Sequence, residues 1–182
     1  PMSDDPVPTW VSTRDEGELS FQDYFVRRQC QPQVEGFCFA GAELAHPAPG
    51  VLEALQAADR IVICPSNPWV SISPILSIPG IKTALHAGTI VVVSPIIAGQ
   101  TVKGPAAKMY AELGIQPSAL AVARHYTELL AQVFQPPGFV MDTQDVDQAG
   151  EVEALGMRVL VTNTLMKSAQ DRARLAKEVL TL

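Results

Sequence analysis

Two short runs of β-branched residues constrain the fold of this chain more than any other feature. Ile61-Val62-Ile63 and Ile90-Val91-Val92-Val93 contain no polar residue. Strands that are half exposed alternate apolar and polar residues, whereas continuous apolar runs are typical of parallel strands that are covered on both faces. Parallel strands also need crossover connections, which are usually helices. The two runs therefore predict an α/β sheet with helices on both sides.

The chain from residue 47 onward alternates between the two patterns in the way this fold requires. Pro105 suits a first helical turn, and Gly114 and Gly156 suit the left-handed residue that follows a helix. We predict a three-layer, Rossmann-like α/β fold with a mostly parallel sheet and right-handed crossovers. The expected helices are 51–58, 81–86, 105–113, 118–131, 146–155 and 170–180, the expected strands are 60–64, 89–94, 138–142 and 158–162, and a loop with a helical turn spans 66–78.

The first residues of the chain differ in pattern and predict a small α+β subdomain. Strands are expected over 9–13 and 34–39, with a turn at 14–17 between the first strand and a short helix. That helix, 21–28, is capped by Ser20 and has Phe21, Tyr24 and Phe25 on its apolar side. This unit buries too little to stand alone. We therefore divide the chain into a small α+β subdomain, 1–46, and a Rossmann-like half, 47–182.

Composition excludes several classes of protein. The 182 residues are 47% apolar and 18% charged, which excludes a mainly disordered chain. The net charge of −6 is accompanied by no dense Lys/Arg cluster, so we expect no nucleic-acid partner. No apolar run reaches the ~20 residues of a membrane span, so no membrane partner is expected. Three cysteines favour a reducing, cytoplasmic location over a disulfide framework.

The loops after the parallel strands are the expected place for a ligand, because ligands bind beyond the carboxyl ends of such strands. The first loop, 64–74, contains three prolines that restrict its conformations. Its neutral donors Ser66, Asn67, Ser71 and Ser73, with a turn after Ser71 that aims helix N–H groups outward, suit a phosphate or a nucleotide edge. Ordinary turn and cap chemistry explains the same residues equally well.

The second loop, 94–105, has a different chemistry. Ser94 opens it, Gly99 and Gly104 permit close backbone approach, and Lys103 supplies a cation just before a predicted helix. These features favour a phosphate site, although neither a Walker A motif nor a G-x-G-x-x-G fingerprint is present. A solvated surface lysine is the alternative. The third loop, 162–166, adds Asn163.

Other sites are not indicated. The three histidines are far apart and no cysteine has metal-ligand spacing, which excludes a zinc motif. Asp142, Asp145 and Asp147 lack the glycine and the terminal glutamate of an EF-hand, and we interpret them as a strand end and a helix cap. No G-x-S-x-G elbow occurs. His125 lies inside an amphipathic helix, where a structural role is favoured.

Several ordered motifs resemble the 2-phospho-L-lactate transferase family (CofD in archaea, FbiA in actinobacteria). The likeness covers essentially the whole chain at consistent spacing. It is carried by residues 1–4, 21–26, 63–68 (Ile-Cys-Pro-Ser-Asn-Pro), 71–76, 79–81, 93–96, 102–109 (Val-Lys-Gly-Pro-Ala-Ala-Lys-Met), 118–126 and 162–166 (Thr-Asn-Thr-Leu-Met).

The resemblance implies an enzyme of coenzyme F420 biosynthesis. Such a transferase moves a 2-phospholactyl or phosphoenolpyruvyl group from a guanosine diphosphate ester (the guanylyl donor) to the ribityl hydroxyl of the deazaflavin Fo, and GMP leaves with assistance from Mg²⁺. It also implies pairing into a homodimer. The chain resembles the C-terminal three-fifths, roughly, of the full proteins, whose Gly-rich turn and acidic motif lie upstream of it. We therefore predict that these residues alone are inactive, and no catalytic or metal-binding residue is assigned.

Two other functions remain open from the sequence. Relatives with a similar sheet act as non-enzymatic regulators that bind a nucleotide sugar without transfer. A generic nucleotide-binding α/β module is supported by the sheet pattern alone. The segment 21–28 and the Ser66-Asn67-Pro68 loop favour the transferase, because they resemble that branch of the family more closely.

Overall fold

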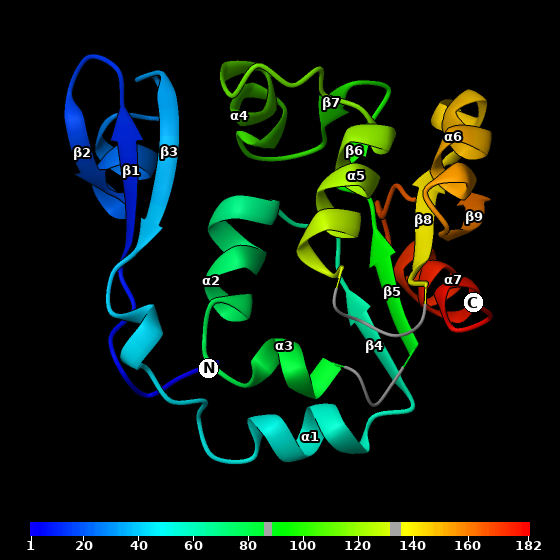
Figure 1. Cartoon of the computed structure of the whole chain (residues 1–182). Helices are drawn as coiled ribbons and strands as arrows, with labels where there is room; N and C mark the ends of the chain where they lie inside the picture. The colour runs from blue at the N-terminus through cyan, green and yellow to red at the C-terminus, as the bar shows by residue number, and fades with distance from the viewer. Residues whose placement is uncertain (86–88, 132–135) are drawn as a thin grey trace.

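The computed structural model of the chain describes residues 1–85, 89–131 and 136–182, and a parallel sheet lies at its centre (Figure 1). Four strands are hydrogen-bonded in the order β4-β5-β8-β9, and every pairing in the sheet is parallel. The predicted α/β fold and its strands are therefore confirmed, with ends that differ by at most one residue. The strands are β4 (Arg60–Ile63), β5 (Thr89–Val93), β8 (Gly138–Asp142) and β9 (Arg158–Thr162).

Helices cover the two faces of this sheet unequally. On one face, Ile63, Val92 and Phe139 belong to a large core with the helices between β3 and β9. On the other face, the smaller core of Val91, Val93 and Val140 is covered by α7 alone among the described helices. The helices are α1 (Val51–Ala57), α2 (Ser73–Leu76), α3 (Ile81–Ala84), α4 (Ala106–Glu112), α5 (Ala119–Leu129), α6 (Ala149–Ala154) and α7 (Ala169–Val179).

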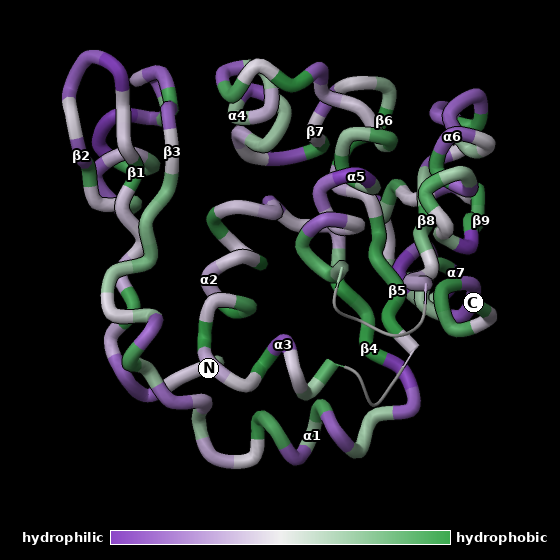
Figure 2. The backbone as a smooth tube through the Cα atoms, in the orientation of Figure 1, coloured by the Kyte–Doolittle hydropathy of each residue, from purple (hydrophilic) through white to green (hydrophobic). Residues whose placement is uncertain are grey.

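The expectation that both β-branched runs are covered on both faces is correct for β5 and wrong in part for β4. Residues 90–93 of β5 are all buried, but Val62 of β4 is 37% exposed. In the described part of the chain β4 is an edge strand, and α7 packs on β5 and β8 beside it rather than on Val62. Figure 2 shows that the residues of β4 and β5 at the centre of the fold are mainly hydrophobic, and that hydrophilic residues lie on the outer turns of the helices.

The N-terminal residues form a small antiparallel sheet beside the larger one (blue in Figure 1). Its order is β2-β1-β3, from β1 (Thr9–Thr13), β2 (Gly17–Ser20) and β3 (Val34–Phe39). The strands β1 and β3 are as predicted, whereas β2 lies in a segment that was expected to be turn. Val11, Tyr24 and Val34 form one core with Met109 of α4, so this sheet is packed against α4. The division of the chain into units 1–46 and 47–182 stays a prediction.

The predicted helix 21–28 is a helical turn whose main part is the π-helix η1 (Asp23–Arg27). Ser20 Oγ accepts the N–H of Asp23 at 3.2 Å, as a cap does. Only part of the expected apolar side is buried, because Tyr24 is enclosed while Phe25 is 44% exposed. Phe21 and Phe25 stack on each other with ring centroids 5.4 Å apart. The exposed ring of Phe25 lines a pocket at the carboxyl edge of the larger sheet.

Three further segments of the chain differ from the predicted elements. The loop after β5 contains a tight hairpin of β6 (Ile96–Ile97) and β7 (Gln100–Thr101). The predicted helix 146–155 is divided into the 3₁₀ segment η5 (Thr143–Gln148) and α6, and a short 3₁₀ turn, η2 (Ala42–Leu44), follows β3. The expected end of helix 81–86 at His86 lies outside the described residues. No described helix is long and apolar enough to span a bilayer.

Candidate functional site

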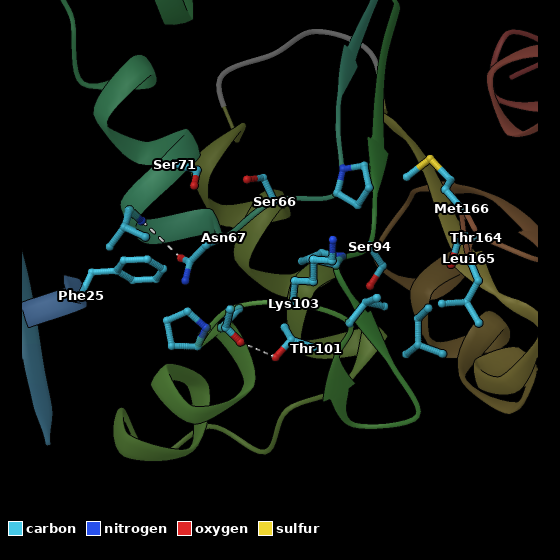
Figure 3. A pocket seen from close by; sticks show the side chains of 18 of the residues that line it. Phe25, Ser66, Asn67, Ser71, Ser94, Thr101, Lys103, Thr164, Leu165 and Met166 are labelled. Atoms are coloured by element: carbon cyan, nitrogen blue, oxygen red, sulfur yellow. Dashed lines mark hydrogen bonds between the residues drawn. The ribbon is translucent and has the colours of Figure 1, made fainter. Parts of the chain in front are cut away.

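Three loops at the carboxyl edge of the sheet converge on one pocket of about 500 Å³ (Figure 3). They follow β4, β5 and β9, as the position of ligands in parallel sheets predicts. The side chains of Phe21 and Phe25 close the pocket from the small sheet. The volume is in the range of small-molecule sites. The lining residues of the three loops are Pro65, Ser66, Asn67, Val70 and Ser71; Ser94, Pro95, Ile97 and 101–106; and Thr164, Leu165 and Met166.

The first loop is shaped by Asn67. Its side-chain Oδ1 accepts the N–H groups of Trp69 and Val70 at 3.0 and 3.2 Å, which caps the π-helical turn η3 (Pro68–Ile72). Trp69 then anchors this turn, because its ring packs edge-on against the rings of Tyr110 and His125. The ring centroids are 4.3 Å and 5.4 Å from that of Trp69. Asn67 therefore satisfies backbone donors of its own loop, which is the cap chemistry that the sequence left open.

His125 lies behind this loop rather than in the pocket. Burial lowers the pKa of its imidazole, so the ring is neutral at pH 7. Its Nε2 and the hydroxyl of Tyr110 are buried without a hydrogen-bond partner among the described residues. The structural role favoured by the sequence agrees with this packing.

The helix N–H groups after Ser71 are not free for an anion, contrary to expectation. The N–H groups of Ser71 and Ile72 both donate to the carbonyl of Asn67, at 3.1 and 3.3 Å. The reason is that η3 runs directly into α2, so the donors of this turn are used inside it. Two hydroxyl groups of this loop remain at the pocket, those of Ser66 and Ser71 (Figure 3).

The second loop combines a fixed start with an exposed cation. Ser94 Oγ donates to the carbonyl of Ile96 at 2.9 Å and lies 3.2 Å from its N–H, so this hydroxyl holds the chain where it leaves β5. Thr101 Oγ1 donates to the carbonyl of Gly104 at 2.9 Å and closes the turn that carries Lys103. Figure 3 shows Lys103 between the Ser66 loop on one side and Leu165 and Met166 on the other.

The third loop is held by a buried carboxylate. Asp142 Oδ2 accepts the N–H and the hydroxyl of Thr164, at 2.8 and 3.1 Å. Burial raises the pKa of Asp142, but the hydrogen bonds from Thr164 and Gln144 outweigh it, and the pKa is lowered. Asn163 Oδ1 accepts the N–H of Leu165 at 3.0 Å. The loop thus presents the side chains of residues 164–166 to the pocket and turns Asn163 to its own backbone.

The structure brings together six of the nine residues that the sequence predicted for substrate binding. The first two loops both line this pocket. Three predicted residues lie outside its lining: Ser73 begins α2, Gly99 is in the β6–β7 turn, and Asn163 is turned away as described. The six lining residues are Ser66, Asn67, Ser71, Ser94, Lys103 and Gly104. Contact of any of the nine with a ligand stays a prediction.

The sequence analysis did not predict that Phe21 and Phe25 form an aromatic wall of the pocket. Phe21 and Phe25 were assigned to the apolar side of a helix, which gave no reason to place them near pocket residues that lie 40 or more positions downstream. The available signal was the three aromatic residues at positions 21, 24 and 25, because exposed aromatic rings often mark binding surfaces. Thr101, Thr164 and Met166 also line the pocket without having been singled out.

The charge of the pocket is simple. Lys103 is the one charged side chain among the described residues that line it. No carboxylate of the described part of the chain lies within 4.0 Å of its Nζ. The lining therefore suits an anion. It does not suit Mg²⁺, which prefers carboxylate oxygens, and residues 1–85, 89–131 and 136–182 contain no cluster of three metal-ligating side chains.

A family model described as 2-phospho-L-lactate transferase CofD matches residues 1–165. The chain belongs to this family. A phosphoenolpyruvate transferase of Streptomyces griseus is 42% identical over all of this chain and 57% of its own length. A 2-phospho-L-lactate transferase of Methanopyrus kandleri is 41% identical over 99% of this chain and 56% of its own. The chain thus spans little more than half the length of these curated relatives.

Solved structures support the fold alone. Two crystal structures of a Bacillus halodurans protein, one described as a member of the UPF0052 family, each match 99% of this chain and 60% of their own. Their TM-scores are 0.66 and 0.63, at 14% and 17% sequence identity. These similarities agree with the parallel sheet described above.

Proposed function

We propose that this chain forms the donor-binding part of a transferase of coenzyme F420 biosynthesis. The proposed donor is a guanosine diphosphate ester of lactate or enolpyruvate, and the proposed acceptor is the ribityl hydroxyl of Fo. One observation carries the proposal: loops from three strands meet at a pocket in which Lys103 is the one charged side chain among the lining residues that the structure describes. The transferase names of relatives at about 40% identity support the same reaction.

The reaction transfers a phosphoryl ester between two oxygens. The ribityl oxygen of Fo attacks the phosphorus that carries the lactyl or enolpyruvyl group, the bond from that phosphorus to the GMP oxygen breaks, and GMP leaves with the electron pair. The proton of the hydroxyl is released. Phosphoryl transfer depends mostly on positioning and on stabilisation of charge. Lys103 is suited to the second task, because its ammonium group faces the pocket without a carboxylate partner.

The other lining residues would bind the substrates without contributing a charge of their own. The hydroxyls of Ser66 and Ser71 can donate hydrogen bonds to phosphate oxygens. Phe25 and Phe21 offer a flat apolar wall, and Leu165 and Met166 a second one, to which an aromatic ring can bind. Asn67 and Ser94 are assigned to the shape of the loops, because Asn67 Oδ1 and Ser94 Oγ bond to backbone and Asn67 Nδ2 donates to Met109 Sδ.

Mg²⁺, the homodimer and the cytoplasmic location stay predictions that come from the sequence. No step above depends on the metal, since the lining holds no carboxylate. Inactivity of these residues alone also stays a prediction. It is tested by mixing the chain with Fo, Mg²⁺ and the lactyl donor, and by measuring F420 precursor formation by fluorescence-detected chromatography.

The binding role is tested separately with GDP as a probe. Isothermal titration calorimetry of the chain should show saturable binding that is lost with Lys103→Ala. Absence of GDP binding by the unmodified chain would contradict the proposal. Binding of GDP, with no transfer even in the full-length protein, would instead favour a regulator that binds a nucleotide sugar.

A further inference from the structure

Two buried carboxylates hold the loops of the pocket without lining it. Asp142 ends β8 and Asp145 follows it in η5, and they are 2% and 1% exposed. No cation of the described residues forms an ion pair with either of them. Buried charges without a counterion are costly unless hydrogen bonds satisfy them. Three of the donors that satisfy them belong to the pocket loops: the N–H groups of Ala98 and Thr164 and the hydroxyl of Thr164.

Asp145 holds the tip of the β6–β7 hairpin. Both of its carboxylate oxygens accept the N–H of Ala98, at 3.0 and 3.1 Å. Gln148 fixes the carboxylate in turn: its Nε2 donates to Oδ1 at 3.4 Å, and its Oε1 accepts the N–H of Leu120 at 2.9 Å. The hairpin is thereby tied to η5 and to the start of α5.

The hairpin turn needs this support because its sequence is unfavourable. Ala98 and Gly99 have φ values of +47° and +74°, the pattern of a two-residue type I′ turn. Glycine adopts such angles freely, and asparagine or aspartate usually takes the first position, whereas alanine does so only with strain. The contact with Asp145, 47 residues away in the chain, stabilises the strained residue. From this turn β7 leads directly to Thr101 and Lys103.

Asp142 holds the loop after β9 by hydrogen bonds in a similar way. One oxygen accepts the N–H and hydroxyl of Thr164, and the other accepts the N–H of Gln144 at 3.1 Å. Two neighbouring carboxylates therefore reach two different pocket loops from one short segment.

We propose that Asp145 is a positioning residue of this site, which keeps the hairpin, and with it Lys103, in the geometry that binds the diphosphate of the donor. Asp142 positions Thr164, Leu165 and Met166 in the same way. The inference rests on the proposed function, because it assumes that a diphosphate occupies the pocket.

The role of Asp145 depends on an acceptor oxygen rather than on a negative charge. Burial raises the pKa of this carboxyl, the N–H of Ala98 opposes that effect, and the nearby charges of Asp142 and Asp147 add to it. The environment thus disfavours the charged form of this carboxyl relative to water. An asparagine retains one acceptor oxygen, whereas a leucine of similar shape has none.

The test compares Asp145→Leu, Asp145→Asn and the matched control Asp147→Leu, which changes an exposed aspartate of the same segment. GDP affinity is measured by calorimetry, and amide hydrogen exchange is measured at Ala98 and over residues 100–104. Asp145→Leu should weaken GDP binding about ten-fold, because displacement of the hairpin should cost Lys103 its contact with the diphosphate, and one hydrogen bond to a charged group is typically worth that much. It should also accelerate exchange over the hairpin. Asp145→Asn and Asp147→Leu should match the unmodified chain in both measurements.

Unchanged GDP affinity and unchanged hairpin exchange in Asp145→Leu would overturn the inference. If the unmodified chain binds no GDP, the proposed function fails, and the exchange data alone then decide whether Asp145 positions the hairpin. If Asp145→Leu does not fold, Ala98 exchange in the unmodified chain and in Asp145→Asn decides. Slow exchange in both supports the role, and exchange as fast as that of an exposed amide in either contradicts it.

Discussion

Replacement of Lys103 by alanine removes the one positive charge that the described residues contribute to the lining of the pocket. If a diphosphate binds there, its oxygens come within contact distance of Nζ. Two unit charges 4 Å apart attract by about 4 kcal/mol at an effective dielectric constant near 20. Lys103 is exposed, so solvent screening and side-chain entropy leave much less of this energy. The low end for hydrogen bonds to charged groups, about 1.5 kcal/mol, is the better value.

This energy corresponds to about a ten-fold loss of GDP affinity. We expect it in calorimetric titrations at low ionic strength, and we expect the difference to shrink as salt is added, because salt screens exposed charges. Lys82→Ala is the matched control, since Lys82 is an exposed lysine of α3 that does not line the pocket. A Lys103→Ala affinity within two-fold of the Lys82→Ala value at low salt would refute the assignment of Lys103.

Three further predictions concern stability and the attachment of the small sheet. Glu112→Ala should destabilise the chain by about 1–3 kcal/mol in urea unfolding and speed amide exchange at Val34, because Glu112 Oε2 accepts that N–H at 3.1 Å; an unchanged exchange rate would exclude this link. Tyr110→Phe should leave stability equal or higher by thermal unfolding, since its buried hydroxyl has no partner among the described residues; a loss above about 2 kcal/mol would indicate a missed partner. Asp142, whose pKa is lowered on folding, stabilises the chain above its unfolded pKa, and this contribution is lost as the pH falls through the folded value; Asp142→Asn should flatten that acid limb, and an unaltered pH profile would contradict the assignment.

The central sheet could be predicted because its signals are local. Ile90–Val93 and the alternation of strand and helix patterns contain the information for a parallel sheet, and glycines 114 and 156 take the left-handed angles expected after helices. The strand β2 could not be predicted in this way. Its sequence, Gly-Glu-Leu-Ser, has little strand character, and it is extended because β1 offers hydrogen bonds to it.

The β6–β7 hairpin was missed for a related reason. A turn at Ala98-Gly99 carries a weak local signal, since alanine disfavours a positive φ, and the carboxylate that stabilises it is far away in the chain. The candidate site was predictable at the level of loops, because the carboxyl edge of a parallel sheet is fixed by topology. The placement of Phe25 and the orientation of Asn163 depend on tertiary contacts that no spacing reveals.

The meeting of two loops around one anion can be tested most directly by NMR. A ¹⁵N-labelled chain is titrated with GDP, and amide shifts are followed at Ser66, Ser71, Lys103 and Gly104. A shared site predicts that the signals of both loops move together with one dissociation constant, and that Lys103→Ala weakens the response of both. Shifts confined to one loop, or two loops that saturate at different GDP concentrations, would contradict it.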